Sequence, residues 1–315
     1  MRARFIGFFT KIKAFLEAIH IPFLGISLYK MFEIYIKGIF QNKLGKLAAA
    51  ISWSFFLSLF PFILFLISLL PHLPHYERLM FYIFEILLPR IMPENILPDV
   101  TYYIKDILLP HRKGLNAMTI ILALIFGTNG TYSLIRGFNE NTTLRRGFIK
   151  EYFISLGVTI AFIALIILTF LGIYYSEIVL KLFTPSYDIS WFVQNLSRII
   201  GFISFPIFYL MLLSLFYWVG CLSISRWVQA LPGAVFTTIL FVLVTYFFAI
   251  YLKNFARYNL LYGSIGSIIV VMIWVNINII LLLLGNELNI AIRNIRLEKE
   301  LAQTASSEKE KHFND

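Results

Sequence analysis

The sequence predicts an all-α polytopic membrane protein, a bundle of six transmembrane helices with amphipathic helices at the N-terminus and in the first outer loop. Composition is the first reason. The chain of 315 residues is 59% hydrophobic and 14% charged, whereas soluble proteins are about 25% charged. The second reason is a set of six apolar runs, each long enough to cross the roughly 30 Å of hydrocarbon in a bilayer. These runs lie near residues 47–70, 115–135, 152–175, 199–221, 228–251 and 264–286.

The same pattern excludes several other classes of protein. None of the runs alternates apolar and polar residues as a barrel strand does, so helices must satisfy the backbone in lipid. The one cysteine, Cys221, excludes an internal disulfide and any CxxC metal or redox motif. We therefore expect no cofactor and no metal site.

The positions of the basic residues predict the orientation in the membrane. Segment 1–46 holds eight Lys and Arg, the loop after the second span four, the loop before the fifth span one and the tail five. The total is 18 on this side, against nine on the other. Because cytoplasmic loops carry the excess of Lys and Arg, both termini are predicted to be cytoplasmic. This placement explains the net charge of +10 without a nucleic-acid partner.

The segments outside the spans divide the chain into three parts. Residues 1–43 contain two amphipathic stretches suited to anionic headgroups of membrane lipids at the cytoplasmic face. Residues 44–292 form the transmembrane domain, and its outer connection, 71–114, holds six of the eleven prolines. Such a connection is typical either of a functional lid or of an inert cap. Two short amphipathic helices are expected in it, over 76–88 and 99–109. Residues 293–315 form a polar cytoplasmic tail that we expect to fray.

Candidate functional residues are polar side chains at membrane depth, because each of them must find a partner or a water-filled cavity. On the first span, small residues including Gly45 and Ser52 form one face that ends at Pro61. Small residues let helix backbones approach closely, and proline kinks a helix. We interpret this face as a packing seam.

A second cluster lies near the end of the second span. Asn129, Tyr132 and Arg136 fall at i, i+3 and i+7 and so share one helix face, and Asn139 follows in the loop. Asn and Arg are costly in a lipid-facing position, so this face indicates a cavity. The alternative is that Arg136 simply extends to the cytoplasmic headgroups.

The second half of the chain contains two further clusters. Before the fifth span Gln229 precedes Pro232 and Gly233, which we expect to loosen the first helical turn; anchoring at the interface explains this cluster adequately. The last span holds the most informative cluster, made of Gly263, Gly266, Asn276, Asn278, Gly285, Glu287 and Asn289.

The membrane depth of two asparagines and the charge of one glutamate make this last cluster a candidate functional site. Asn276 and Asn278 lie near mid-membrane, where an amide without partners costs about 1–3 kcal/mol. Glu287 lies at the cytoplasmic end, where it is compatible with a structural salt bridge, for example to Arg136, and equally with an acid that couples protons or substrate. We predict that these four residues and Asn129 converge on one polar cavity.

Several of these motifs resemble the YihY/virulence factor BrkB family of bacterial inner-membrane proteins, formerly labelled ribonuclease BN. The run Gly-Lys-Leu-Ala-Ala-Ala-Ile-Ser-Trp-Ser-Phe-Phe from Gly45 resembles the opening span of that family. The closing half is similar in Leu231-Pro232-Gly233-Ala234, in Tyr262-Gly263-Ser264-Ile265-Gly266 with Trp274, and in Gly285-Asn286-Glu287-Leu288-Asn289. The family usually has Gly-Ala-Glu-Leu-Asn there, so Asn286 is a departure. The resemblance covers roughly residues 35–292 and implies a six-helix protein of the bacterial inner membrane. Family members have been linked to serum resistance and to transport of lipids or lipopolysaccharide precursors.

The sequence favours a transporter or translocase of a lipid or another amphipathic envelope substrate, working through a polar cavity between helices. The alternatives are a non-catalytic scaffold for envelope machinery and a narrow channel. A homo-oligomer or an envelope protein partner is compatible with each of them. An enzyme is not expected, because the chain has no HxH, HExxH, GxSxG or Walker pattern. His72 and His75 could pair on a metal, but they lie in the outer connection without a third ligand nearby.

Overall fold

A computed structural model describes eight continuous stretches of the chain and isolated positions between residues 13 and 36. The stretches are 42–69, 76–81, 84–85, 97–102, 105, 117–183, 206–255 and 258–314. The helices are α3 (Asn42–Leu69), α4 (Tyr76–Phe81), α6 (Leu97–Tyr102), α7 (Ala117–Phe138), α8 (Phe148–Phe183), an unlabelled helix Pro206–Gly220, α10 (Trp227–Phe255) and α11 (Tyr258–Asn314). The prediction of a helical protein is thus confirmed.

Apolar helices long enough to cross a bilayer confirm a multi-pass membrane protein. In the described residues four stretches have this length and composition: Leu44–Leu66 in α3, Phe148–Leu168 in α8, Trp227–Leu252 in α10 and Ile268–Thr304 in α11. The helix Pro206–Gly220 is apolar but shorter. It coincides with part of the predicted fourth span, and α7 coincides with the predicted second span. The count of six crossings stays a prediction.

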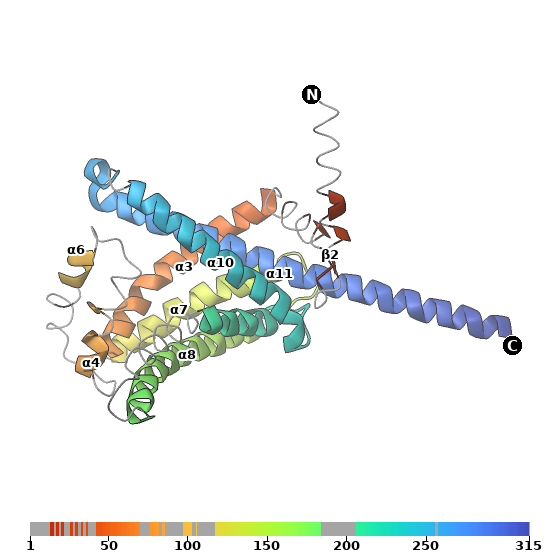
Figure 1. The fold of residues 1–315 in the computed structure, drawn as a ribbon, viewed down its shortest axis with the longest axis horizontal. Coiled ribbons are helices and arrows are strands. Elements are labelled where there is room, and N and C mark those ends of the chain that lie inside the picture. Colours follow the sequence, from red (N-terminus) through yellow and green to blue (C-terminus); the bar gives the residue numbers. More distant parts are fainter. Residues whose placement is uncertain are drawn as a thin grey trace.

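The helices pack in two groups that share one core. The helix α7 lies between α3 and α8, while α10 lies along α11, which also contacts α3 (Figure 1). The core joins α3, α7, the helix Pro206–Gly220, α10 and α11 through side chains such as Ile135, Tyr217 and Leu288. Large apolar side chains such as Phe153 and Phe247 remain exposed, which is the surface that a bilayer requires.

The predicted fraying of the tail is wrong. The helix α11 continues as one helix of 57 residues through Asn314, and its second half leaves the bundle (Figure 1). The sequence after Arg293 is rich in Leu, Glu, Lys, Gln and Ala, which have high helix propensities. These propensities account for a helix that continues without packing against the bundle.

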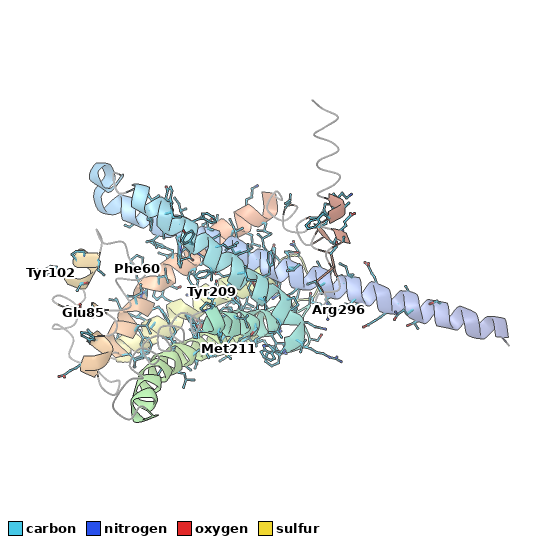
Figure 2. All side chains as sticks on the ribbon, viewed as in Figure 1. Phe60, Glu85, Tyr102, Tyr209, Met211 and Arg296 are labelled. Atoms are coloured by element: carbon cyan, nitrogen blue, oxygen red, sulfur yellow. The ribbon has the colours of Figure 1, made fainter. Side chains whose placement is uncertain are left out.

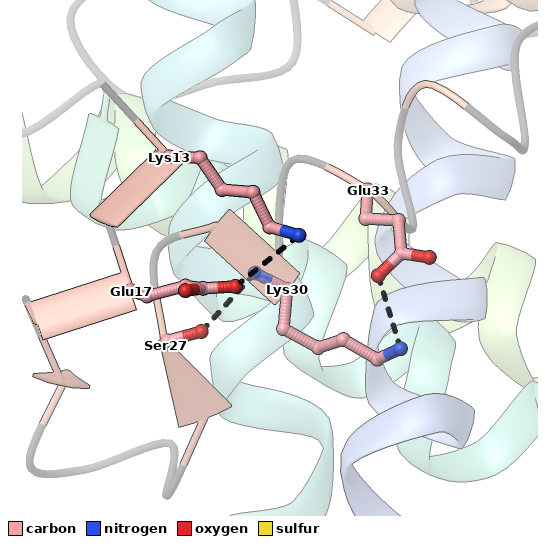
Figure 3. A network of polar contacts seen from close by, with 5 residues as sticks. All are labelled: Lys13, Glu17, Ser27, Lys30 and Glu33. Carbon is pink, nitrogen blue, oxygen red and sulfur yellow. Dashed lines mark hydrogen bonds and ion pairs between the residues drawn. The ribbon is translucent and has the colours of Figure 1, made fainter. Parts of the chain in front are cut away.

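The N-terminal part differs from the purely helical prediction. Two-residue strands, β1 (His20–Ile21) and β2 (Ile26–Ser27), pair antiparallel. Beside them, Lys30 Nζ lies 3.0 Å from Glu33 Oε2, and Lys13 Nζ lies 3.8 Å from Glu17 Oε1. Both pairs are drawn in Figure 3. All four side chains are partly exposed, and such pairs contribute about 0–1 kcal/mol to stability.

The outer connection contains helices near the predicted positions. The helix α4 (Tyr76–Phe81) lies within the predicted 76–88. The helix α6 (Leu97–Tyr102) begins two residues before the predicted 99–109. In this connection Lys105 Nζ lies 3.5 Å from Glu85 Oε1. The labels in Figure 2 place Glu85 and Tyr102 at the end of the molecule opposite the projecting part of α11.

Candidate functional site

Polar side chains gather at one end of the bundle, where α7 ends, α10 begins and α11 leaves the core. We call this region the junction end; it comprises residues 139–147, 220–229 and 285–300. Asn139 ties two of its helices together. Its Nδ2 donates hydrogen bonds to Ile135 O (2.9 Å) and Gly220 O (2.8 Å), and its Oδ1 accepts one from Leu222 N (2.8 Å). The side chain is buried and satisfies carbonyls at two helix ends, so it acts as a clamp.

A second buried amide inserts into the first turns of α10. Asn289 Oδ1 accepts a hydrogen bond from Gly233 N (2.6 Å), and its Nδ2 donates to Ala230 O (3.1 Å). Pro232 has no backbone N–H and interrupts the helical hydrogen-bond ladder here. The predicted loosening of this turn is therefore compensated by a side chain from α11.

The backbones of α10 and α11 touch at this crossing. A Cβ at Gly233 would overlap Gly285 O, and one at Gly285 would overlap Thr237 Oγ1 and Tyr217 Oη. The Tyr217 hydroxyl donates to Leu282 O (2.9 Å) and lies 3.1 Å from Thr237 Oγ1. Tyr217 and Thr237 are completely buried. The two glycines are thus required for close approach, a role that was not assigned to this pair in the sequence analysis.

Three other candidate residues, Gln229, Asn276 and Asn278, form hydrogen bonds that stabilise the helices or join them. The Oε1 of Gln229 accepts hydrogen bonds from Ser225 N (3.1 Å) and Arg226 N (3.3 Å). This is the backbone contact of a capping box at the start of α10. Near mid-bundle, Asn276 Nδ2 donates to Ser52 Oγ (3.1 Å) and joins α11 to α3. Asn278 instead bonds to the carbonyl oxygen of Trp274 on its own helix (2.7 Å).

The structure does not bring the predicted cavity residues together. Asn129 is exposed on α7, and Tyr132 packs its ring against Phe148 and Tyr152. Arg136 and Glu287 line different cavities, and Glu287 Oε1 accepts a hydrogen bond from Asn141 Nδ2 (3.0 Å). The described residues contain no ion pair between Arg136 and Glu287, so the predicted pair and the single convergent cavity are wrong.

The predicted packing residues agree only in part. On α3, Ser52 is buried and accepts a hydrogen bond from Asn276 of α11, whereas Gly45 is exposed and a Cβ there would meet nothing within 4 Å. The helix α3 packs against α7 at Ile51, which contacts Gly137, and Leu44 beside Gly45 is buried in the core, so Gly45 lies on the side of α3 that faces away from this packing. The helix α3 continues through Pro61. Gly266 is buried in α11, while Gly263 lies in the same helix with its surroundings outside the described residues.

A cavity of about 450 Å³ opens at the junction end between α3, α7 and α11. We call it the central cavity. Its lining comprises Leu44, Lys46, Leu47, Gly137, Glu140, Asn141, Leu283, Asn286 and Glu287. Asn286 is 2% exposed, and its Nδ2 donates to Phe138 O (3.0 Å). Its Oδ1 is buried and accepts no hydrogen bond from the described part of the chain, so one of the residues that line the cavity has a buried acceptor without a partner.

Two further cavities at the junction end are rich in arginine. One of about 310 Å³ includes Arg136, Arg145 and Arg146, of which Arg146 Nη1 donates to Val219 O (3.1 Å). The other, of about 410 Å³, lies between the start of α10 and α11 and includes Arg226 and Arg293. Of these arginines, only Arg136 was named from the sequence as a candidate cavity residue, and the others were used to orient the chain.

Some residues that build the site were not recognised in the sequence. Tyr217 and Thr237 lie inside apolar runs, where their hydroxyls have no local signal. Asn286 was noted only as a departure from the motif. Among the described residues no group of three or more His, Cys, Asp or Glu could hold a metal ion, and His72 and His75 lie outside those residues.

These features define a multi-pass helical membrane protein whose polar chemistry is concentrated at one end of the bundle. The sequence model of the family described as virulence factor BrkB matches residues 35–310, and the chain belongs to this family. No solved structure matches the chain.

Relatives with similar sequences are named as membrane proteins or ribonuclease-like proteins. A ribonuclease-like protein of Bacillus subtilis (strain 168), YfkH, is 30% identical over 77% of this chain and 87% of its own length. A UPF0761 membrane protein of Kangiella koreensis is 26% identical over 86% of this chain and 67% of its own length. Another UPF0761 membrane protein, from Histophilus somni (strain 129Pt), is 22% identical over 84% of this chain and 91% of its own length.

Proposed function

We propose that this protein translocates a lipid or another amphipathic envelope substrate, whose polar headgroup enters the central cavity. The observation that carries the proposal is the mixed lining of this cavity around the unpartnered Asn286 Oδ1. Leu44, Leu47 and Leu283 provide apolar contacts, whereas Lys46 and Glu287 provide one charge of each sign. A volume of about 450 Å³ lies within the usual range for ligand sites.

The proposed path runs along the interface of α3 and α11. Lys46 and Glu287 lie at the junction end of this interface, and the hydrogen bond from Asn276 to Ser52 lies deeper along the same two helices. Eleven residues separate Glu287 from Asn276, which corresponds to about 16 Å along an α-helix. A headgroup that leaves the cavity would exchange its contacts with Glu287 for the Ser52–Asn276 pair, while the acyl chains stay in the bilayer.

We further infer six crossings of a bacterial inner membrane, with both termini cytoplasmic. Lys46, Arg136, Arg146, Arg226 and Arg293 all line cavities of the junction end. Because basic residues favour the cytoplasmic side, their concentration at one end supports a cytoplasmic junction end. The proposal includes no enzymatic activity.

Lipid movement in proteoliposomes tests the proposal. The full chain is reconstituted with a phospholipid whose headgroup carries a fluorophore, and dithionite then quenches the label in the outer leaflet. The protein should accelerate loss of the inner-leaflet signal over protein-free vesicles, with or without a proton gradient. Glu287→Gln should slow this rate about tenfold while expression and folding stay normal, since about 1.4 kcal/mol of headgroup binding is lost.

A matched control separates the cavity from general effects of charge. Glu298 is exposed on the same helix but outside the central cavity, so Glu298→Gln should translocate lipid at the normal rate. Equal slowing by both variants would contradict the assignment of the cavity, and a rate no greater than in protein-free vesicles would refute the translocase.

A scaffold is the second candidate, because several polar groups of the core are already used between helices. Asn139, Asn289 and Tyr217 bond to the backbones of neighbouring helices, as expected for a rigid bundle. A stable protein that copurifies with an envelope protein but moves no lipid would favour this alternative.

A further inference from the structure

The cavity between the start of α10 and α11 has a composition that differs from that of the central cavity. We call it the arginine cavity. Its volume is about 410 Å³, and Figure 2 shows Arg296 on α11 where this helix leaves the bundle. The lining consists of Ser225, Arg226, Gln229, Pro232, Asn289, Ile292, Arg293, Arg296, Leu297 and Glu300.

Positive charge exceeds negative charge in the arginine cavity. Three guanidinium groups face a single carboxylate, that of Glu300. Neither Arg226 nor Arg293 forms an ion pair within the part of the chain that the structure describes. Arg226 also precedes the first residue of α10, where the helix dipole adds about half a positive charge. This is a setting for an anion, and guanidinium groups match phosphate oxygens with paired hydrogen bonds.

The neighbouring surface of α10 indicates where the anion comes from. Trp227 and Val228 are 49% and 54% exposed, and Val235 and Ile239 continue the same apolar face at helical spacing. Val228 lies one residue before Gln229 of the cavity, so the apolar face borders the cavity lining. Tryptophan is enriched at the level of the headgroups. A ligand with a phosphate and acyl chains fits both the arginine cavity and the apolar face of α10, whereas free phosphate fits only the cavity.

We propose that the arginine cavity binds the phosphate group of an anionic phospholipid of the surrounding leaflet. The acyl chains of this lipid lie on the face of Val228, Val235 and Ile239. The bound lipid holds α11 against the start of α10, at the point where α11 leaves the bundle. This binding is independent of translocation through the central cavity, and basic pockets between membrane helices are suited to such headgroups.

Lipid binding to the delipidated full chain in detergent tests the proposal, with native mass spectrometry as the readout. The probes are dioleoylphosphatidylglycerol, dioleoylphosphatidylcholine and inorganic phosphate. We expect phosphatidylglycerol to bind at least tenfold more tightly than phosphatidylcholine. Arg293→Gln should weaken phosphatidylglycerol binding about tenfold or more, because a charged hydrogen bond contributes about 1.5–3 kcal/mol. Arg293→Lys should retain part of the affinity.

Two further variants control for charge and for folding. Lys150 is exposed in the first turn of α8 and does not line the arginine cavity, so Lys150→Gln should bind phosphatidylglycerol normally. If Arg293→Gln fails to fold, Arg226→Gln on the other side of the cavity should show the same loss. Equal affinity for both lipids, or an unchanged affinity in a folded Arg293→Gln variant, overturns the proposal. Binding of inorganic phosphate as tight as that of phosphatidylglycerol overturns the assignment to a lipid.

Discussion

Adding one methyl group at Gly285 should weaken the crossing of α10 and α11. In Gly285→Ala the new Cβ would overlap Thr237 Oγ1 and Tyr217 Oη and would lie 3.1 Å from Gly233 O. Tyr217 has no space to rotate, because its side chain is fully buried and its hydroxyl is bonded to Leu282 O. The two helices must therefore separate, or the hydrogen bonds must break.

The change in the free energy of unfolding combines two destabilising contributions and one stabilising contribution. Overpacking of a tight core costs about 1–3 kcal/mol. The two hydrogen bonds of the Tyr217 hydroxyl are worth about 0.6 kcal/mol each at a membrane helix interface. Alanine gains about 1 kcal/mol over glycine in a helix interior. The net effect is a loss of about 1–3 kcal/mol in the free energy of unfolding.

Gly157→Ala is the matched control, since Gly157 lies in α8 and a Cβ there meets nothing within 4 Å. It should be neutral or stabilising by up to about 1 kcal/mol, the propensity gain alone. Unfolding of the full chain by dodecyl sulfate in mixed micelles, followed by circular dichroism, measures both variants. Adding Thr237→Ala removes one of the two clashing oxygens and should restore part of the stability. If Gly285→Ala is as stable as Gly157→Ala, the reasoning about the glycine contact is wrong.

Two further predictions concern topology and activity. A reporter fused to the end of α11 should be active only in its cytoplasmic form, because 18 of the 27 basic residues lie on the side that contains both termini; periplasmic activity would overturn the orientation. The purified chain should not cleave RNA above a mock-purified control, with or without divalent metal. Cleavage that His72→Ala or His75→Ala abolishes would contradict the prediction that this protein is not an enzyme.

The helices could be predicted because their signal is local. Run length and hydrophobicity place α7 and α10 within a few residues of their observed positions. The end of α11 was missed for a physical reason. Its first part is apolar and the part after Arg293 is polar. Hydrophobicity therefore predicts that the helix ends near Arg293, whereas the helix propensity of the following residues extends it.

The candidate site could be predicted only in part, because many of its side chains form hydrogen bonds with backbone atoms. Asn139 and Asn289 were named as candidate cavity residues, but the sequence does not show which carbonyl or N–H group each side chain contacts. Of the three residues predicted on one face of α7, Tyr132 and Arg136 line one cavity, whereas Asn129 is exposed and does not line it. The helix α7 has polar residues on other faces too, and Thr128 and Thr131 face the core instead. Periodicity alone does not decide which polar face points inward.

The distribution of contacts also decides where the bundle can open. At the crossing of α10 and α11, glycine backbones touch and Asn289 fills the interrupted ladder, so separating these helices would expose several buried polar groups at once. At the interface of α3 and α11, the Ser52–Asn276 bond is the one hydrogen bond between side chains among the described residues, and it lies deeper than the central cavity. Breaking one such link costs about 0.6 kcal/mol on average. Of these two interfaces, that of α3 and α11 therefore loses fewer polar contacts when the helices separate, which agrees with the path proposed for a headgroup.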